Sequence, residues 1–403
     1  MRETALERFL RYAGMDTTSD ETSNASPSSA GQWNLAQAVR ADLESIGAQD
    51  VHVDENSYVY GRLPANAAGQ PVIALIAHLD TADAVPGRVF APAVRRFEGG
   101  RLPLNETLGL ALDEKDFPAL KGFIGQELVV TDGTTVLGAD DKAGIVEILR
   151  AFEILADRPD IPHGEVWAVF TPDEEIGSGA AKLQLERIRA DFAYTVDGGA
   201  LNEIEYENFN AAAARVTIRG RNAHPGYAKG KMINAAKLAM KYHALLPEAM
   251  CPEQTEGYEG FLHLRKISGT EENAVLDYII RDHDAALFEK KKELMRKAAD
   301  DLNLREGERT ASVEITESYR NMKEVIARVP HVLERAVRAV RACGMEPAFV
   351  PIRGGTDGAR LSFAGLPCPN LGTGGMNWHS VYEFLPVEAL EKMAEVLVEV
   401  VRA

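Results

Sequence analysis

Four stretches in the first half of the chain place carboxylate or imidazole groups directly after a run of apolar residues. The groups are His78 and Asp80, the pair Asp140 and Asp141, the acids Asp173 to Glu175, and Asp197. Any one of these stretches taken alone is more simply explained as a turn or a helix N-cap. Four of them in one half of one chain are poorly explained as unrelated turns, and they indicate a shared site.

The candidate ligands of this site are imidazoles and carboxylates, with no cysteine among them. They are His78, His379, Asp80, Asp140, Glu174, Glu175 and Asp197. This set suits Zn2+, and also Co2+ or Mn2+. The groups are numerous enough for two ions that share a bridging carboxylate, as in two-metal hydrolytic sites. One carboxylate must stay off the metals to act as a general base for water, and the residue types alone do not show which one.

The elements that must position these groups are buried parallel strands. Continuous apolar runs, the pattern of strands covered on both faces, occupy residues 72–77, 165–170 and 192–196. Residues 136–144 combine apolar residues, a tight turn, two acids and a helical pattern, which predicts a strand–turn–helix corner. Because open α/β sheets place their sites at the carboxyl ends of the strands, we expect the acids and histidines to gather there.

The composition changes after about residue 207. Strand and helix patterns then follow in the order β-α-β-β-α-β, which predicts a ferredoxin-like α+β module of residues 208–320. This module is inserted into a first, α/β domain formed by residues 1–207 and 321–403. A long connection at residues 86–135 contains a Gly-Gly turn and hairpin strands, and its length predicts an insertion near the site.

The composition excludes several functional classes. The chain has 403 residues, a net charge of −17 and three scattered cysteines without CxxC spacing. The acidic surplus argues against a nucleic-acid binder, because phosphate neutralisation needs clustered Lys and Arg. No stretch approaches the roughly 20 apolar residues of a membrane span. The cysteines fit a reducing compartment, and the N-terminal amphipathic pattern differs from a signal peptide. We therefore expect a cytoplasmic protein that binds neither nucleic acid nor membrane.

Several motifs resemble those of the co-catalytic zinc peptidase family, and within it those of the tripeptide aminopeptidases. They are His78-x-Asp80 after its apolar run, Gly138 to Gly144, Thr171 to Gly177, the late His379, and residues 131–137, 222–226, 277–284 and 353–358. The resemblance spans essentially the whole chain and is highly specific around Asp140 and Glu174. It implies a mixed-sheet zinc-peptidase catalytic domain with an inserted α+β ferredoxin-like lid domain.

The resemblance also implies which residues hold two zinc ions, for which Co2+ or Mn2+ could substitute. His78 and Asp197 are similar to the ligands of one ion, and Glu175 and His379 to those of the other. Asp140 is similar to the carboxylate that bridges both ions together with a water or hydroxide.

Two catalytic roles follow from the same resemblance. Asp80 matches the acid that orients His78, and Glu174 matches the general base that takes a proton from the bridging water and passes it to the leaving amine. The peptide bond between Asp140 and Asp141 is expected to be cis, as in the family.

Three further residues are assigned by resemblance, His224 and Arg281 in the inserted domain and Arg353 in the returning part of the first domain. His224 is similar to the residue that stabilises the tetrahedral oxyanion, Arg281 to the residue that binds the C-terminal carboxylate of the substrate, and Arg353 to a residue of the substrate pocket. From the residues alone, His224 is a turn histidine before Pro-Gly. Arg281 alone is a strand arginine paired with Asp277 or Asp282.

The implied activity is hydrolysis of the N-terminal residue of tripeptides by a metallo-aminopeptidase that uses a zinc-bridging hydroxide. Alternatives with the same chemistry are a di-zinc dipeptidase, a carboxypeptidase or an N-acyl-amino-acid deacylase. An alternative from another class is a non-catalytic peptide-binding protein, which has no need of Glu174. Trp378 and Ser380 to Tyr382 depart from the family pattern around His379, which leaves the substrate preference open. The sequence also leaves open whether the protein is a monomer or a homodimer.

Overall fold

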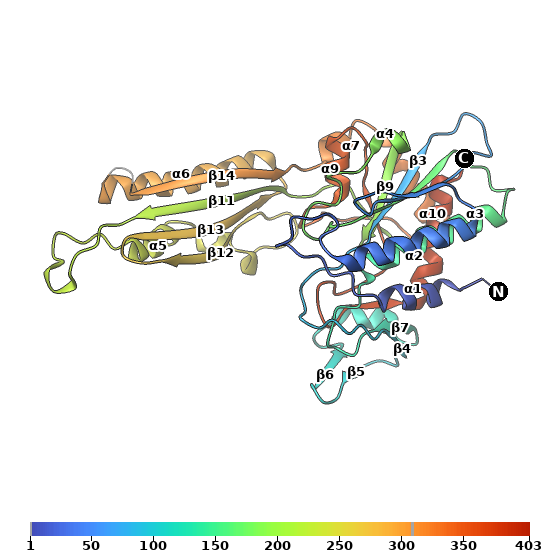
Figure 1. Ribbon diagram of the computed structural model, residues 1–403, viewed down its shortest axis with the longest axis horizontal. Helices are drawn as coiled ribbons and strands as arrows, with labels where there is room; N and C mark the ends of the chain where they lie inside the picture. The colour runs from blue at the N-terminus through green and yellow to red at the C-terminus, as the bar shows by residue number, and fades with distance from the viewer. Residues whose placement is uncertain (1, 308–309) are drawn as a thin grey trace. The chain divides into compact units, whose positions relative to one another are not determined.

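The computed structural model describes residues 2–307 and 310–403, which form two compact units (Figure 1). The first unit comprises Met1–Tyr206, Glu324–Val350 and Thr356–Ala403; the second comprises Glu207–Lys323 and Pro351–Gly355. Met1 and residues 308–309, which the expected domains include, lie outside the described residues. Residues 351–355 pack with the second unit, whereas the sequence analysis assigned them to the first domain.

A mixed sheet forms the centre of the first unit. In the described residues it has eight strands, in the spatial order β1 (Gln49–Val53), β2 (Val59–Leu63), β8 (Val166–Thr171), β3 (Ile73–His78), β9 (Phe192–Gly198), β16 (Asn370–Gly372), β10 (Glu203–Glu205) and β15 (Ala348–Phe349). The strands from β8 to β16 run parallel, and β2 and β10 flank them in the antiparallel direction. Every residue of β3 and β8 is buried, as their continuous apolar runs predict.

Helices cover both faces of this sheet. One face packs against α1 (Ala5–Ala13), α2 (Ala30–Ile46), α3 (Ala139–Asp157), α8 (Pro330–Ala342) and α10 (Val387–Val401). The other face packs against the short helices α4 (Leu185–Ile188) and α9 (Asp357–Phe363). Leu75 belongs to the first core and Ile76 to the second, because successive side chains of a strand point to opposite faces. The central strands are therefore held from both sides, and their carboxyl ends form a fixed platform.

The long connection predicted at residues 86–135 forms strands that lie outside the central sheet. β4 (Ala93–Arg96), β7 (Glu127–Val130) and β17 (Phe384–Pro386) make one sheet, and β5 (Arg101–Asn105) pairs with β6 (Leu110–Asp113). A 3-10 turn, η1 (Pro118–Phe123), precedes β7. Gly99 and Gly100 have φ values of 98° and 74°, a conformation that glycine adopts without strain. The predicted Gly-Gly turn is therefore present.

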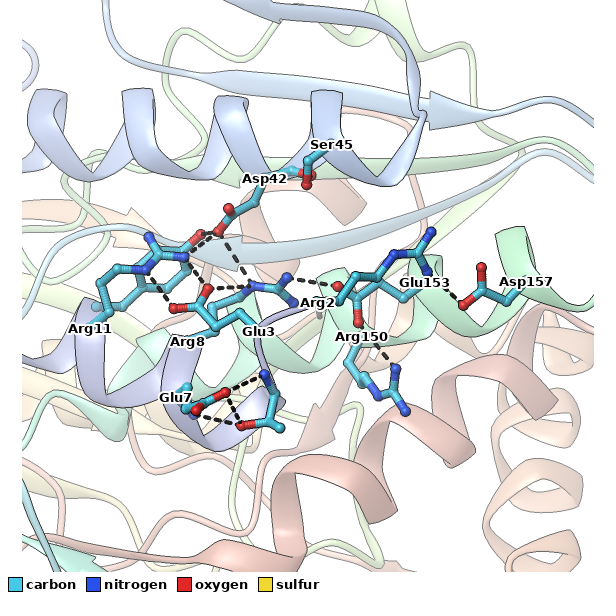
Figure 2. A network of polar contacts seen from close by, with 12 residues as sticks. Arg2, Glu3, Glu7, Arg8, Arg11, Asp42, Ser45, Arg150, Glu153 and Asp157 are labelled. Atoms are coloured by element: carbon cyan, nitrogen blue, oxygen red, sulfur yellow. Dashed lines mark hydrogen bonds and ion pairs between the residues drawn. The ribbon is translucent and has the colours of Figure 1, made fainter.

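A network of ion pairs joins α1, α2 and α3 (Figure 2). Arg8, which is 3% exposed, lies 2.7 Å from Glu153 of α3 and 3.3 Å from Asp42 of α2. Arg11 lies 2.8 Å from Asp42 and 2.5 Å from Glu3. The network fixes the first two helices to the helix that begins at the acidic corner.

The second unit is an antiparallel sheet with two helices. Its strands lie in the order β12 (Phe261–Gly269), β13 (Asn273–Asp282), β11 (Asn210–Arg219) and β14 (Ala311–Tyr319). The helices are α5 (Ala235–His243) and α6 (Ala285–Glu306), and the 3-10 turns are η2 (Pro225–Tyr227), η3 (Glu248–Met250) and η4 (Pro252–Gln254). The chain therefore runs β-α-β-β-α-β, as predicted.

A separate apolar core lies between this sheet and its helices, with Val216, Leu276 and Phe288 among its buried residues. A further short helix, α7 (Lys323–Ile326), follows the second unit in the chain. Among the helices of the described residues, none is both long enough and apolar enough to cross a bilayer.

Candidate metal centre

His78 is the last residue of β3, and its imidazole faces carboxylates from two other segments. The side chain is 2% exposed. Its Nδ1 lies 2.9 Å from the backbone carbonyl oxygen of Asp80, so Nδ1–H donates to that oxygen. Its Nε2 lies 2.9 Å from Oδ1 of Asp140 and 3.5 Å from Oδ1 of Asp197. The second ring nitrogen is therefore directed at the carboxylates, as in a metal ligand.

The acidic corner begins at Gly138, whose φ of 77° turns the chain into α3. The peptide bond between Asp140 and Asp141 is cis, as the resemblance implies. Glu383, which is 1% exposed, accepts the backbone N–H groups of Leu137, Gly138 and Asp140 at 2.7, 2.9 and 3.1 Å. One buried carboxylate thus holds the backbone of the corner.

The loop after β8 carries Glu174 and Glu175, and the buried carboxylate of Asp80 holds its backbone. Oδ1 of Asp80 accepts the N–H of Glu174 at 2.9 Å, and Oδ2 accepts the N–H of Glu175 at 3.1 Å. The same carboxylate lies 3.4 Å from Nδ1 of His78, farther than the Asp80 carbonyl oxygen. Asp80 therefore contacts His78 chiefly through its carbonyl group, and its carboxylate positions the acidic loop.

His379 approaches the same carboxylates from a loop between β16 and β17. Its Nε2 lies 2.9 Å from Oε1 of Glu175 and 3.1 Å from Oδ2 of Asp140. The side chain is 51% exposed, so this edge of the site is open to solvent. Its neighbour Trp378 packs beside Gly199, where an added Cβ would come within 3.4 Å of the indole. Although Trp378 departs from the family pattern, the imidazole of His379 still contacts Asp140 and Glu175.

Burial and the close approach of like charges shift the pKa values of these groups. Burial raises the pKa of Asp197 to about 7, and it also raises the pKa of Glu175. Hydrogen bonds to Asp140 and Glu175 raise the pKa of His379 to about 11. Burial opposes ionisation of Asp140, but the hydrogen bonds from His379 and His78 outweigh it and lower the pKa of Asp140. The ionised form of these carboxyl groups is therefore stabilised by positive charge nearby.

Two overlapping groups of ligand atoms in the described residues each lie within 4.8 Å of one another. One group is His78, Asp140 and Glu175, and the other is His78, Asp141 and Asp197. Nitrogen and oxygen donors without sulfur suit zinc, cobalt or manganese. Oδ1 of Asp141 is buried without a hydrogen-bond partner in the described residues, and burial raises the pKa of this carboxyl well above its usual value. A cation would supply the missing partner, so the residues present fit a metal centre.

The three remaining predicted residues lie in the second unit. Nδ1 of the exposed His224 accepts the N–H of Gly226 at 3.1 Å, so the neutral imidazole carries its proton on Nε2. The half-buried Arg281 donates to the carbonyl oxygens of Ile280 and Ala212 at 3.0 and 3.4 Å. Its guanidinium lies 5.3 Å from the centre of the Tyr319 ring. The roles that the resemblance implies for His224 and Arg281 in substrate binding therefore stay predictions.

The acids that offered an alternative pairing for Arg281 have other partners. Asp277 accepts from Arg215 at 2.8 Å, and Asp282 accepts from Lys291 at 2.5 Å. Arg353 donates to the carbonyl oxygens of Gly257 and Glu259 at 2.7 and 3.0 Å. These bonds give Arg353 a structural role in the second unit, and its place in a substrate pocket stays a prediction.

Three buried acids near the site are not predicted from the sequence as site residues. The sequence pattern places Asp141 in the acidic corner but does not indicate it as a ligand. Glu383 precedes the apolar strand β17, and an acid at the start of a buried strand was the signal that could have found it. Oδ2 of Asp357 accepts from Oγ1 of Thr171 at 2.8 Å, and burial raises the pKa of Asp357 to about 6.

The chain is similar to known peptidases over nearly its whole length. The sequence pattern of peptidase family M20/M25/M40 matches residues 133–403. Peptidase T of Caldanaerobacter subterraneus subsp. tengcongensis is 50% identical over 98% of this chain and 97% of the relative. Peptidase T of Clostridium novyi is 49% identical over 99% of this chain and 98% of the relative.

The fold has a solved counterpart as well. The crystal structure of aminopeptidase PepT from Bacillus cereus superimposes with a TM-score of 0.75 and 26% identity, covering 98% of this chain and 97% of that one. The metal-ligand geometry at the ends of β3, β8 and β9 agrees with these similarities. The chain therefore belongs to peptidase family M20/M25/M40, and among the members of that family it is similar to peptidase T.

Proposed function

We propose that this protein is a metal-dependent aminopeptidase that removes the N-terminal residue of tripeptides. The observation that carries the proposal is the convergence of His78, Asp140, Glu175 and His379 on one point. The buried Glu174 carboxyl interacts electrostatically with Asp197, His78 and Glu175. The sequence identity of about 50% to peptidase T over nearly the full length supports the same activity. A peptide-binding protein without catalysis would have no use for a free carboxylate next to the ligands.

Two zinc ions are the cofactors we propose, with His78 and Asp197 on one, Glu175 and His379 on the other, and Asp140 between them. Bound there, the ions would polarise the scissile carbonyl and lower the pKa of a water molecule. Cobalt or manganese would fit the same nitrogen and oxygen donors.

Glu174 is the residue we assign as general base. Its backbone N–H and that of Glu175 are both bound by the Asp80 carboxylate, so the side chain starts from a fixed backbone. In the reaction, the Glu174 carboxylate accepts a proton from the attacking water, holds it, and donates it to the leaving amine. Asp80 acts through Glu174 and His78 by positioning them.

The second unit supplies the remaining substrate contacts in this proposal. His224 donates Nε2–H to the oxygen on which negative charge develops, which is where a preorganised donor is most effective. Arg281 binds the substrate's C-terminal carboxylate, for which the planar guanidinium fork is well suited. We also assign Arg353 to the substrate pocket; its guanidinium binds the carbonyl oxygens of Gly257 and Glu259 in the same unit.

A cytoplasmic location is the compartment we propose. The three cysteines, Cys251, Cys343 and Cys368, are all free. Free thiols are typical of a reducing compartment, where structural disulfides do not persist.

The test is to measure release of the N-terminal amino acid from a free tripeptide by zinc-loaded protein, beside the variant Glu174→Gln. We expect kcat of the variant to fall by about 10²- to 10⁴-fold, the usual contribution of general-base catalysis, while its zinc content is unchanged. The N-acetylated tripeptide should resist hydrolysis, and the C-terminal amide should be cleaved with a raised KM.

Each alternative activity gives a different result in this assay. Equal cleavage of the N-acetylated tripeptide would support a deacylase or carboxypeptidase instead. Cleavage of dipeptides in preference to tripeptides would support a dipeptidase. An intact tripeptide in the presence of bound zinc would support a binding protein.

A further inference from the structure

The residue before Glu174 has an unusual backbone conformation. Asp173 has a φ of +58°, a left-handed value that few residues other than glycine adopt, although Asp and Asn tolerate it. Its carbonyl oxygen accepts the N–H of Ser178 at 2.9 Å, and the carbonyl oxygen of Glu174 accepts the N–H of Gly177 at 2.6 Å. These bonds close the acidic loop into a tight turn, and the conformation of Asp173 sets the direction in which Glu174 leaves it.

Gln32 of α2 binds Asp173 in both directions. The Gln32 amide donates Nε2–H to Oδ1 of Asp173 at 2.7 Å, and its Oε1 accepts the Asp173 backbone N–H at 3.0 Å. The backbone N–H of Ser28 donates to both carboxylate oxygens of Asp173 at 2.9 and 3.0 Å. Gln32 is fully buried and Asp173 is 2% exposed. The pair is separated by 141 residues in the chain, so these contacts arise only in the folded protein.

Glu174 is thus held on two sides by different elements. On one side, Gln32 and Ser28 fix the side chain and N–H of Asp173; on the other, Asp80 at the end of β3 fixes the N–H groups of Glu174 and Glu175. Without the first support, the segment between Pro172 and Glu174 could rotate while Asp80 still held its far end. A displacement of about 1 Å is enough to cost about 10²-fold in rate when a catalytic group must reach a proton.

We infer that the Gln32–Asp173 pair is a positioning device for the general base Glu174. The inference rests on the proposed function, because it assigns the pair a role in the same hydrolytic step. In the described residues, the polar contacts of the Asp173 side chain are with Gln32 and Ser28, and none is with a proposed metal ligand. Their expected effect is therefore on kcat, through the orientation of the Glu174 carboxylate, and not on zinc binding or KM.

The geometry offers a reciprocal substitution as the test. Gln32→Glu removes the donor and sets two carboxylates against each other. Asp173→Asn removes the negative charge and leaves a single oxygen to accept the N–H groups of Gln32 and Ser28, so it weakens the pair less than Gln32→Glu does. The double variant Gln32→Glu/Asp173→Asn reverses the pair, because the amide at position 173 donates to the carboxylate at position 32. It also restores the original net charge of the pair, and Asn tolerates the left-handed conformation at position 173.

We expect Gln32→Glu to lower kcat for a free tripeptide by about tenfold or more, and Asp173→Asn to lower it by a smaller factor, with KM and bound zinc within about twofold of the wild type in both. The double variant should recover kcat to within about threefold, which is the coupling that a double-mutant cycle measures. Amide hydrogen exchange of residues 172–178 gives a second readout that needs no substrate. Exchange should quicken in both single variants and slow again in the double variant.

The matched control is Gln184→Glu, which places the same charge beside Asp54, 3.3 Å from the Gln184 amide in the same unit. It should leave kcat unchanged. If Gln32→Glu does not fold, Gln32→Met, which keeps the length and removes the bonds, tests the same prediction.

Three outcomes would overturn the inference. One is single variants with unchanged kcat and a lowered melting temperature, which would make the pair purely structural. Another is a loss of activity that parallels a loss of zinc. The third is a double variant that folds but does not recover kcat or slow exchange. An inactive wild type would instead refute the proposed function, and hydrogen exchange would still decide whether the pair holds the loop.

Discussion

Glu383 is the residue that holds the acidic corner in place. Its carboxylate accepts three backbone N–H groups, including that of Asp140. Burial raises the pKa of Glu383 to about 7, and the hydrogen bonds from Gly138 and Asp140 act against that rise. The carboxylate therefore works as an acceptor for backbone groups next to the ligands.

Glu383→Gln should weaken zinc binding. The amide nitrogen of Gln would donate where the backbone also donates, so at least one of the three hydrogen bonds to the backbone is lost. Asp140 is then less well oriented. We expect the affinity for zinc to fall by about 10- to 100-fold, the usual effect of residues that orient metal ligands. Titration of the metal-free protein with zinc against a chelating dye measures it.

The control for this substitution is Glu7→Gln in α1, where Glu7 accepts the backbone N–H of Thr4 at 2.8 Å far from the site. Its zinc affinity should equal that of the wild type. Equal affinities for Glu383→Gln and the wild type would show that these hydrogen bonds do not orient Asp140.

For individual residues, the sequence predicts the proposed metal ligands but not the buried residues that hold the backbone of the ligand loops. His78 ends the apolar strand β3 and Glu175 follows β8, and that local pattern marks them. Asp140 follows the apolar pair Val136 and Leu137, which the sequence predicts as a strand but which form an irregular segment before α3. Gln32 and Glu383 bind backbone groups 141 and more than 240 residues away in the chain. No local pattern distinguishes a buried Gln in a helix from an exposed one until the helix has a neighbour.

The packing of α1, α2 and α3 against one another involves one buried arginine side chain. Arg8 of α1 is paired with Glu153 of α3 and Asp42 of α2 (Figure 2). Both Arg8 and Glu153 are at most 3% exposed. Burying such a pair is costly, and removing one partner leaves the other charge in a poor environment.

Arg8→Met should lower the free energy of unfolding of the first unit by about 3 kcal/mol, the lower end for a broken buried ion pair. The effect is at the lower end because Arg150 still binds Glu153 at 3.1 Å and Arg11 still binds Asp42. The double variant Arg8→Met/Glu153→Met should be more stable than Arg8→Met alone, because no buried charge is left unpaired. Urea unfolding measures both.

The exposed pair Arg40–Glu44, 2.9 Å apart on the surface of α2, provides the control. Arg40→Met should change the free energy of unfolding by about 0.5 kcal/mol or less. An equal loss for Arg8→Met and Arg40→Met would contradict the role of the buried network.

Elements with a strong hydrophobic pattern were predictable, and short ones were not. The runs at 72–77 and 165–170 became β3 and β8 because both faces of each strand are buried. The edge strand β15 is only two residues long and is paired on one side, by β10. Pairing of β7 with β17 joins segments about 250 residues apart, which periodicity does not reveal.

At the scale of the whole molecule, the second unit carries its own core. Its sheet and two helices bury a cluster that includes Leu238, Tyr242 and Met295. The predicted module of residues 208–320 differs from the observed unit mainly by residues 351–355, which join it from a later part of the chain. Composition could show where a module starts and stops, but not that a distant segment returns to it.

An excised fragment of residues 207–323 should therefore fold on its own, since its core needs no residue from the first unit. Circular dichroism and a cooperative thermal transition measure this. The fragment lacks Arg353, which bonds to Thr255, Gly257 and Glu259 in the full chain. We expect amide exchange in residues 255–259 to quicken in the fragment while exchange in β11 and β13 stays slow. A fragment without a cooperative transition would show that the unit depends on the rest of the chain.

The segments where the chain enters and leaves the second unit are joined by hydrogen bonds to the side chains of Asn208 and Asn321. The N–H of Asn208 donates to Oδ1 of Asn321 at 3.2 Å, and the N–H of Met322 donates to Oδ1 of Asn208 at 2.8 Å. Because the chain leaves and returns at one point, residues 207–323 can be exchanged as one continuous segment without rethreading the first fold, and only residues 351–355 of the second unit stay behind. Descendants of one ancestral gene could thus acquire new substrates by cassette replacement, while the strands that carry the ligands are inherited unchanged.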